Sequence, residues 1–410
     1  MRMNLQLLCV AVLLSLAGSA HALEFSKAEL ARATTLQKRL VTLDSHLDTP
    51  ANLERADFDM LQAHAGNRLS QVDYPRMVDG ALDGGFWAVY TGQGNRSAAA
   101  HLDDRDAGLK IHALVAAQPQ RFAFATTPAD AARIKADGKR VVYISMENAS
   151  PLVADPTLLR FYYAQGLRLM STVHFLNNEF ADSATDPKGP EWKGLSSAGK
   201  QLVQQAQALG IVIDQSHASD AVFDQLIALS PVPIVLSHSG ARAVFNHPRN
   251  IDDARLKVLA EHGGVIQVNS YGGYLVDSGA SPERKAAEKA LTDRYGGWEH
   301  VKIADGTALS AALQDLDARY PIKRATEEDF FAHLEHVLSV VGPDHVGIGM
   351  DWDGGGGVVG LEDVSKLPRI TAWLLRKGYS EQQIAGIWGG NLLRVMQQAQ
   401  DYATRQVKAS

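Results

Sequence analysis

The chain has 410 residues, a formal net charge of −6 and a hydrophobic fraction of 46%. This composition suits a globular enzyme with a large core, and the negative charge provides no basic field that would bind nucleic acid or an anionic membrane. Length alone leaves the number of domains open, because α/β barrels often form one long domain.

Residues 1–22 have the pattern of a secretory signal peptide: a positive charge, an apolar run at 5–16 and then small residues that end in Ala20-His21-Ala22, an Ala-x-Ala pattern. The run is shorter than the roughly 20 apolar residues of a membrane anchor. We therefore expect a protein secreted or exported to the periplasm, without an anchor. Cys9 is the only cysteine and lies in this segment, so the processed chain, residues 23–410, has no disulfides or thiolate ligands.

Short β-rich apolar runs recur along the chain, separated by segments with helical periodicity, which is typical of parallel strands joined by crossover helices. The predicted strands are Val41–Leu43, Phe86–Tyr90, Val141–Ser145, Leu167–Ser171, Ile211–Ile213, Ile234–Leu236, Val265–Val268 and Val346–Ile348. The clearest predicted helices are Gly199–Leu209, Asp220–Leu229, Asp252–His262 and Phe330–Val341. Eight such strands predict an α/β fold, a closed (β/α)8 barrel of the TIM type in a single catalytic domain.

Two helix starts can be read from their caps. Ser281 followed by Pro282 offers an N-cap with proline at the first helical position, and Ser380 with Gln383 forms a capping box. The segment at about 270–325, before the last strand, is long for a connection, so we expect an insert that covers the site or builds an oligomer contact.

Histidine and acidic residues gather where the predicted strands end, which is where barrels of this kind carry their reactive groups. These residues are His46, Asp48, Glu147, His174, His217, His238, Asp351 and Asp353. Any one of these histidines alone is more often structural or solvated. Independent structural uses would not place four histidines and several acids at six of eight strand ends, so the pattern predicts one site.

The ligand types predict the metal. Imidazole and carboxylate without thiolate suit zinc and other borderline divalent ions, and five such groups are too many for one tetrahedral catalytic zinc with an open position. Two zinc ions that share one carboxylate would use all five ligands. Glu147 is the expected bridge, with His46 and Asp48 on one ion and His217 and His238 on the other.

Two further acids are interpreted as supports. Each of them stands at a strand end, but two ions already have enough ligands without it. We therefore expect Asp353 to orient neighbouring groups and Asp214 to hold His217.

Ordered motifs across about residues 41–396 make the chain resemble the membrane (renal) dipeptidase family of zinc dipeptidases, which have amidohydrolase-like barrels. The matching segments are Asp44–Pro50, Gly84–Tyr90, Glu147-Asn148, Thr172–His174, Asp214–His217, Ser237–Ser239, Arg249-Asn250, Gly349–Gly354, Gly360–Lys366 and Asn391–Val395. The resemblance implies the same five metal ligands that the strand ends indicate.

The resemblance also implies roles for other residues. His174 corresponds to the histidine that stabilises the tetrahedral oxyanion, and Arg249 to the arginine that receives the substrate carboxylate. Asp351 corresponds to the acid that moves the proton, and Tyr271 to a substrate-contacting tyrosine. The implied reaction is hydrolysis of a dipeptide, L-Xaa followed by L- or D-Xaa, by a metal-bridging hydroxide.

The sequence also departs from the family. Met350-Asp351-Trp352-Asp353-Gly354 stands where the family often has Ser-Asp-Phe-Asp-Gly. The cysteines of a disulfide-linked, lipid-anchored dimer are missing, which leaves a homodimer open. Two alternatives are a related metal-dependent hydrolase of lactams, lactones or N-acyl amino acids, and a non-catalytic binding protein on the same barrel.

Overall fold

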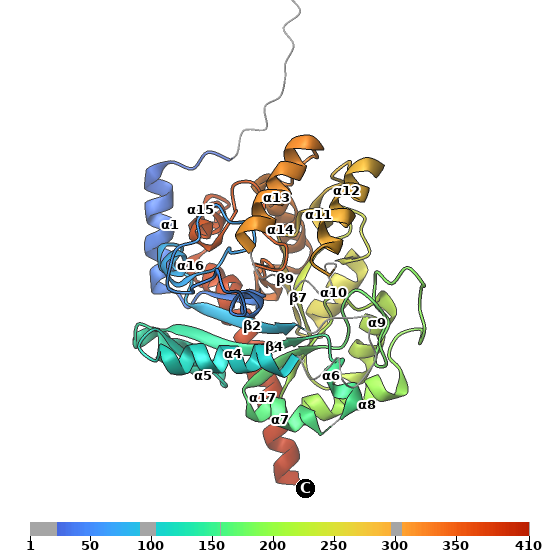
Figure 1. Ribbon diagram of the computed structural model, residues 1–410. Helices are drawn as coiled ribbons and strands as arrows, with labels where there is room; N and C mark the ends of the chain where they lie inside the picture. The colour runs from blue at the N-terminus through green and yellow to red at the C-terminus, as the bar shows by residue number, and fades with distance from the viewer. Residues whose placement is uncertain (1–22, 91–103, 156, 297–305, 410) are drawn as a thin grey trace, which may run out of the picture.

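The computed structural model describes residues 23–90, 104–155, 157–296 and 306–409. Its parallel strands pair in the order β1-β2-β4-β5-β6-β7-β9-β10, with β3 beside β4 and β8 beside β7, and helices surround them (Figure 1). The strands are β1 (Leu43–Leu47), β2 (Gly84–Tyr90), β3 (Phe122–Phe124), β4 (Arg140–Glu147), β5 (Leu167–Ser171), β6 (Val212–Asp214), β7 (Val235–Ala241), β8 (Asn250–Ile251), β9 (Val265–Val268) and β10 (Val346–Ile348). The predicted barrel is confirmed.

The barrel closes between its first strand and the residues just after its last. Leu47 forms a parallel bridge with Trp352, and the Asp48 N–H donates to the Trp352 carbonyl at 2.9 Å. Trp352 is fully buried. The closure therefore joins the segment that carries Asp48 to the segment that carries Asp351.

The four helices predicted by range are present as α8, α9, α10 and α14, with small differences at the ends of three of them. The helices are α1 (Lys27–Arg39), α2 (Thr49–Asn52), α3 (Tyr74–Asp79), α4 (Asp104–Ala117), α5 (Pro128–Ala136), α6 (Pro151–Ala154), α7 (Leu158–Ala164), α8 (Ser197–Ala208), α9 (Asp220–Leu229), α10 (Asp253–Glu261), α11 (Gly272–Leu275), α12 (Pro282–Asp293), α13 (Gly306–Arg319), α14 (Glu327–Val341), α15 (Pro368–Arg376), α16 (Glu381–Ala385) and α17 (Asn391–Ala409). The caps at Ser281 and Ser380 form as predicted. Helix α14 starts three residues earlier than predicted, because Thr326 and Asp329 form a capping box.

Several strands extend further than predicted. β1 runs through His46, β4 ends on Glu147 and β7 runs through His238, so these side chains lie within strands rather than just beyond them. Polar residues did not end the strands because their side chains face other polar groups inside the barrel. β3 and β8 were not predicted, since two or three residues give too little periodicity.

Helix α17 closes the end of the barrel where the strands begin. Four of its residues pack in one cluster with apolar residues near the starts of five strands; the cluster includes Leu392, Val395, Met396 and Ala399 of α17 and Leu43, Val141, Val212, Val235 and Val265 of the strands. Figure 1 shows α17 below the barrel. The polar strand ends therefore lie at the opposite, C-terminal end.

The predicted insert contains helices α11, α12 and α13, which Figure 1 shows at the top of the molecule. A small separate apolar cluster joins the two longer helices through Leu291, Leu309, Leu313 and Leu316. The insert contacts the segment after β1, where Arg68 Nη1 lies 2.7 Å from Asp317 Oδ2 and the Thr307 N–H donates to Asp57 at 3.0 Å. It thus packs against the connection that follows Asp48.

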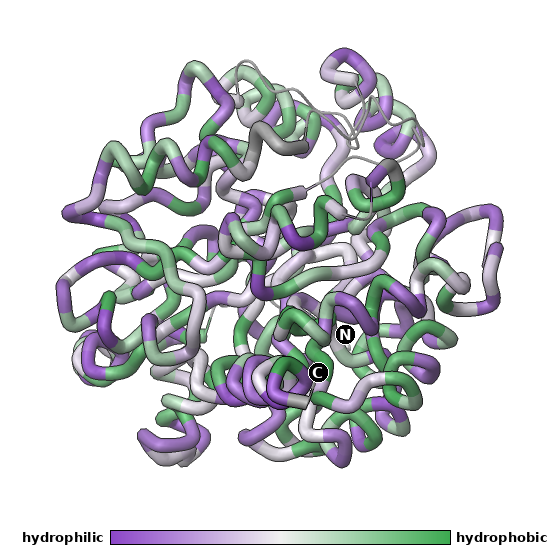
Figure 2. Tube along the Cα trace, turned by 90° about the horizontal axis from the view of Figure 1, so that it is seen from below, coloured by the Kyte–Doolittle hydropathy of each residue, from purple (hydrophilic) through white to green (hydrophobic). Residues whose placement is uncertain are grey.

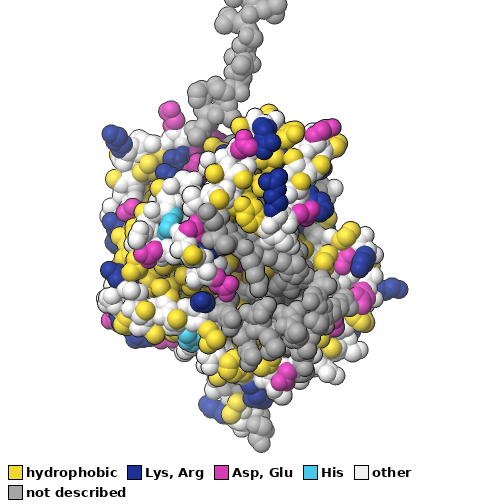
Figure 3. All heavy atoms as spheres, in the orientation of Figure 1, with side chains coloured by type: hydrophobic (Ala, Val, Ile, Leu, Met, Phe, Trp, Pro, Cys, Tyr) yellow, Lys and Arg dark blue, Asp and Glu magenta, His cyan; other side chains and the backbone are white. Residues whose placement is uncertain are grey.

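The surface is mixed in character. Basic and acidic side chains are interspersed on the face that Figure 3 shows, and in Figure 2 hydrophilic residues gather on the outer turns of the peripheral helices. No helix in the described ranges has the length and apolar character needed to span a membrane.

His333 of α14 ties that helix to β7 and to α11. Its Nδ1 accepts from the Ala241 N–H at 3.0 Å, and its Nε2 lies 3.3 Å from the Leu275 carbonyl. Because Nδ1 accepts, the ring is neutral with its proton on Nε2. Burial lowers the pKa of His333 to about 4.

His333 gives a prediction for stability against pH. As pH falls from about 6.5 to about 4, the unfolded chain takes up the imidazole proton before the folded chain does, so the free energy of unfolding decreases by up to about 3 kcal/mol. The His333→Asn variant keeps an acceptor for Ala241 but does not titrate. Urea unfolding of both proteins at intervals across this window should show the smaller decrease in the variant. Parallel pH profiles would contradict this role.

Candidate active site

Seven predicted side chains converge at the C-terminal end of the barrel. They come from six different strands or the residues just after them, and all are buried; they are His46, Asp48, Glu147, His174, His217, His238 and Asp351. Three overlapping groups of them place their nitrogen and oxygen atoms within 4.8 Å of one another. The structure therefore brings together residues that are some three hundred positions apart in the sequence.

Glu147 lies at the centre of this cluster, and its two oxygens face different partners. Oε2 is 3.4 Å from His46 Nε2. Oε1 is 3.2 Å from His217 Nε2 and 3.5 Å from His238 Nε2. The carboxylate thus contacts donor atoms through both of its oxygens, as a bridging ligand would.

Each side of Glu147 has its own set of donors. On one side His46 Nε2 is 3.4 Å from Asp48 Oδ2, and these two residues form a group with Asp351. On the other side the Nε2 atoms of His217 and His238 are only 2.8 Å apart. Two imidazole lone pairs directed at one point repel each other unless a proton or a cation lies between them.

Burial and neighbouring charges perturb the histidines in opposite directions. Burial lowers the pKa of His174, His217 and His238 well below the ordinary value, and charges on Arg249 and His46 lower it further. Burial also acts on His46, but the carboxylates of Glu147 and Asp48 outweigh it and raise its pKa. Three of the four imidazoles are therefore neutral, the form that binds metal.

The acids of the cluster are perturbed as well. Burial raises the pKa of Glu147, and burial together with the charge of Asp48 raises the pKa of Asp351 well above its ordinary value. Like charges crowded in an apolar barrel resist ionisation. The cluster consequently favours any ligand that brings positive charge.

The donor set fits divalent cations. Within the described part of the chain, the buried atoms His46 Nε2 and Asp48 Oδ1 have no hydrogen-bond partner. Buried polar atoms without partners are uncommon and call for an explanation such as a bound ion. Imidazole nitrogens and carboxylate oxygens around a shared glutamate are also the ligand types of zinc sites.

The backbone at the site adopts a rare conformation. His217 and Asp351 have φ values of 71° and 64°, in the left-handed region that non-glycine residues seldom occupy. Asn148, next to Glu147, has φ 68°. Such conformations persist where the surrounding structure fixes them, and they cluster at functional sites.

The glycine run after Asp353 lets the backbone approach the acids. A Cβ atom at Gly354 would collide with the carboxylates of Asp48 and Asp351, and one at Gly355 would collide with the ring of Tyr271. The glycines are therefore needed for close packing at the site.

The two supporting acids each bind neighbouring segments. Asp353 accepts from the Gln71 N–H at 2.5 Å and from Thr49 Oγ1 at 2.8 Å, so it orients neighbouring segments as predicted. Asp214 accepts from the N–H of Ser216, the residue before His217, at 2.9 Å, which fits the predicted support. Asp214 also contacts Ser237, which adjoins and contacts His238, because the end of β6 lies beside β7; this second contact was not predicted.

Arg249 lies beside the cluster. Its Nη2 donates to the His238 carbonyl at 3.0 Å, and its guanidinium carbon lies 5.2 Å from the centre of the Tyr274 ring. Its Nε is buried without a hydrogen-bond partner among the described residues. The guanidinium therefore keeps a donor for a bound anion.

Tyr271, the N-cap residue of α11, and Tyr274, within α11, stack with their ring centres 4.3 Å apart. Burial and the charge of Asp351 raise the pKa of Tyr271 to about 12, so its hydroxyl stays protonated. Tyr274, whose ring supports Arg249, was not predicted as a site residue. The four-residue Tyr-x-x-Tyr spacing of Tyr271 and Tyr274 on a short helix was the available signal.

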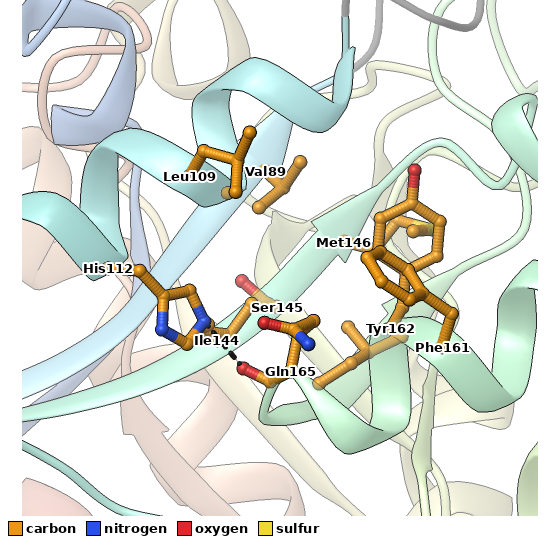
Figure 4. Close-up of a pocket in the computed structure, with 11 residues that line it drawn as sticks. Val89, Leu109, His112, Ile144, Ser145, Met146, Phe161, Tyr162 and Gln165 are labelled. Atoms are coloured by element: carbon orange, nitrogen blue, oxygen red, sulfur yellow. Dashed lines mark hydrogen bonds between the residues drawn. The ribbon is translucent and has the colours of Figure 1, made fainter.

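A separate cavity of about 240 Å³ lies on the other side of the barrel wall. Figure 4 shows it between α4 and α7, over the outward-facing residues Ile144 and Met146 of β4. None of the converging acids or histidines lines it. The cavity is therefore distinct from the candidate active site.

Comparison with known proteins gives one consistent family. The family profile for membrane dipeptidase (Peptidase family M19) matches residues 30–410. Dipeptidase aclJ of Aspergillus oryzae is 30% identical over 335 residues, which cover 80% of this chain and 69% of that protein. Dipeptidase 3 of Rattus norvegicus is 26% identical, over 92% of this chain and 69% of that one.

Solved structures agree with this result. The probable dipeptidase PvdM from Pseudomonas aeruginosa is 28% identical with a TM-score of 0.78, over 92% of this chain and 100% of that one. The dipeptidase AC, a metallo peptidase of family M19, is 25% identical with a TM-score of 0.68, over 87% and 98% of the two chains.

The crowded acids predict that cations stabilise the fold. Adding zinc to the metal-free protein should raise its melting temperature by several degrees, since a ligand at a thousandfold excess over its Kd adds about 4 kcal/mol to the stability of the folded state. Differential scanning calorimetry would measure the shift. The Glu147→Gln variant keeps the shape of the side chain but replaces one carboxylate oxygen with an NH₂ group and removes the negative charge. It should show a much smaller shift. Equal shifts in both proteins would mean that zinc binds elsewhere.

Proposed function

Because this chain belongs to the membrane dipeptidase family, Peptidase family M19, it is a metal-dependent dipeptidase, and we propose that it works with two zinc ions. The substrate would be a dipeptide, L-Xaa followed by L- or D-Xaa. The proposed ligands are His46 and Asp48 for one ion, His217 and His238 for the other, and Glu147 for both.

The observation that supports this proposal is the two-sided position of Glu147. Its Oε2 faces His46 and its Oε1 faces His217 and His238, so one carboxylate can serve two ions. Two zinc ions bound there would supply a nucleophile at neutral pH, because such ions lower the pKa of water. Zinc suits the nitrogen and oxygen donors better than a hard cation that prefers all-oxygen sites.

Arg249 would position the substrate. A guanidinium holds a carboxylate with two parallel hydrogen bonds, and Arg249 is fixed against Tyr274 and the His238 carbonyl. Binding of the C-terminal carboxylate at this point would bring the only peptide bond of a dipeptide to the cluster around Glu147. In a longer peptide the bond next to the N-terminal residue would lie further from the bound carboxylate, so this contact would favour dipeptides.

His174 and Asp351 would act on the reacting atoms. His174 is neutral and its Nε2 lies 3.8 Å from Glu147 Oε1, where a ring N–H can donate to the oxyanion of the tetrahedral intermediate. Asp351 has a raised pKa, which suits a group that takes a proton from water and gives it to the leaving amine.

We also propose export. The support is the signal-peptide pattern of residues 1–22, which lie outside the described residues. A chain exported in this way would hydrolyse dipeptides in the periplasm or outside the cell.

Zinc content and activity test the proposal together. The purified protein should contain two zinc ions per chain by elemental analysis and should hydrolyse dipeptides but not tripeptides. Removal of both ions by a chelator should abolish activity, and added zinc should restore it. A single ion per chain at full activity would contradict the two-zinc proposal, and hydrolysis of N-acyl amino acids or lactams instead of dipeptides would contradict the substrate class.

Arg249→Leu should raise KM for dipeptides strongly, because the substrate carboxylate loses its partner. Losing a charged hydrogen bond of this kind weakens binding by about 2 kcal/mol or more, which corresponds to roughly thirtyfold. Steady-state kinetics on a dipeptide and on its C-terminal amide would measure the effect. Wild-type enzyme should prefer the free acid and the variant should not. A preference retained in Arg249→Leu would place carboxylate recognition elsewhere.

A further inference from the structure

The two histidines on the Oε1 side of Glu147 are held in different ways. His238 Nδ1 lies 2.8 Å from the hydroxyl of Ser237, its neighbour in β7. His217 Nδ1 is buried and has no hydrogen-bond partner in the described ranges. The Nε2 atoms of the two rings face each other, so only His238 has a further side-chain contact, at Nδ1, that can fix the position of its ring proton.

The hydroxyl of Ser237 has a second contact that fixes its direction. Its Oγ lies 2.5 Å from Asp214 Oδ2. A hydroxyl has one proton to donate, and a carboxylate accepts it in a short, strong hydrogen bond. Because Ser237 donates to Asp214, it can only accept from His238, so the ring proton lies on Nδ1.

The carboxylate of Asp214 is itself fixed. Its Oδ1 accepts from the backbone N–H groups of Ser216 at 2.9 Å and Ser237 at 2.8 Å. These two donors occupy one oxygen and direct the other at the Ser237 hydroxyl. All the residues involved are buried, so no bulk water competes for these bonds.

We propose that Asp214 and Ser237 form a relay that places the ring proton of His238 on Nδ1 and leaves its Nε2 lone pair directed at the cation site. The inference rests on the proposed function, in which His238 binds an ion through Nε2. Asp214 and Ser237 are positioning residues, since they act on the ion only through the imidazole of His238. A ring with its proton on Nε2 would have to move that proton before it could bind.

A purely structural role would explain only part of this arrangement. Asp214 could hold β6 against β7 through the two backbone N–H groups alone. That role does not require the Ser237 hydroxyl to contact both the free carboxylate oxygen and the ring nitrogen of His238. The two roles can be separated, because Asp214→Asn changes one of them and not the other.

The Asp214→Asn variant should reverse the relay without changing its shape. The two backbone N–H groups need an acceptor, so the amide oxygen of the asparagine takes the Oδ1 position. Its NH₂ group then faces Ser237 and donates to the hydroxyl. Ser237 in turn donates to His238 Nδ1, which moves the ring proton to Nε2, where the cation should bind.

Metal affinity is the first test. Competition of the full-length protein with a chromophoric chelator should show that Ser237→Ala and Asp214→Asn bind the weaker of two zinc ions about 10- to 100-fold less tightly than wild type. Ser239→Ala is the matched control, because Ser239 lies on the other side of His238 in β7 and contacts Ser216 and Arg249 instead. Its zinc affinity should be unchanged.

The tautomer of His238 is the second test, and it does not depend on zinc. ¹⁵N NMR of histidine-labelled, metal-free protein should show the Nδ1–H tautomer in wild type and Ser239→Ala, and the Nε2–H tautomer in Asp214→Asn. The relay is wrong if wild-type His238 carries its proton on Nε2, or if all variants bind two zinc ions equally tightly. If wild type binds no second ion while the tautomers change as described, the two-zinc proposal fails and the relay stands.

Discussion

The crowding of buried carboxylates and imidazoles around Glu147 is the constraint on which the rest of the structure depends. Burying a charged group is unfavourable unless the group is paired or bound to a metal. In this site burial shifts the pKa of Glu147, Asp351 and three histidines. A barrel tolerates this because each group is attached to a different strand. The site exists only when the whole ring of strands is closed.

The scaffold meets this constraint from both ends. At the end of the barrel where the strands begin, apolar side chains of α17 pack against several strands. This packing opposes movement of the strands along one another. At the top, the bridge between Leu47 and Trp352 joins the two edges of the ring, and the glycine run passes close to Asp48 and Asp351. Rigid support of this kind holds reacting groups in fixed geometry and does not require the loops to order on binding.

Much of this could be predicted from the sequence, and the failures have physical reasons. Apolar runs located the eight strands, and the residue types at their ends indicated one site. The ends of β1 and β7 were missed because polar residues inside a barrel continue a strand when other strands satisfy them. The contact of Asp214 with Ser237 and the role of Tyr274 were missed, because they depend on which strands are neighbours and how rings stack, which single-sequence patterns do not contain. The role of His333 was not predicted, because its two partners are backbone groups that no residue pattern indicates.

The cavity beneath α4 and α7 has a consequence for the strand that it adjoins. Along β4, side chains alternate between the two faces of the wall, so Glu147 points inward while Met146, its neighbour, faces the 240 Å³ space. Atoms that line a cavity have fewer protein neighbours than atoms inside a close-packed wall. The stretch of wall that carries the central carboxylate is thus backed by fewer packing contacts on its outer side, which gives it room to yield under compression.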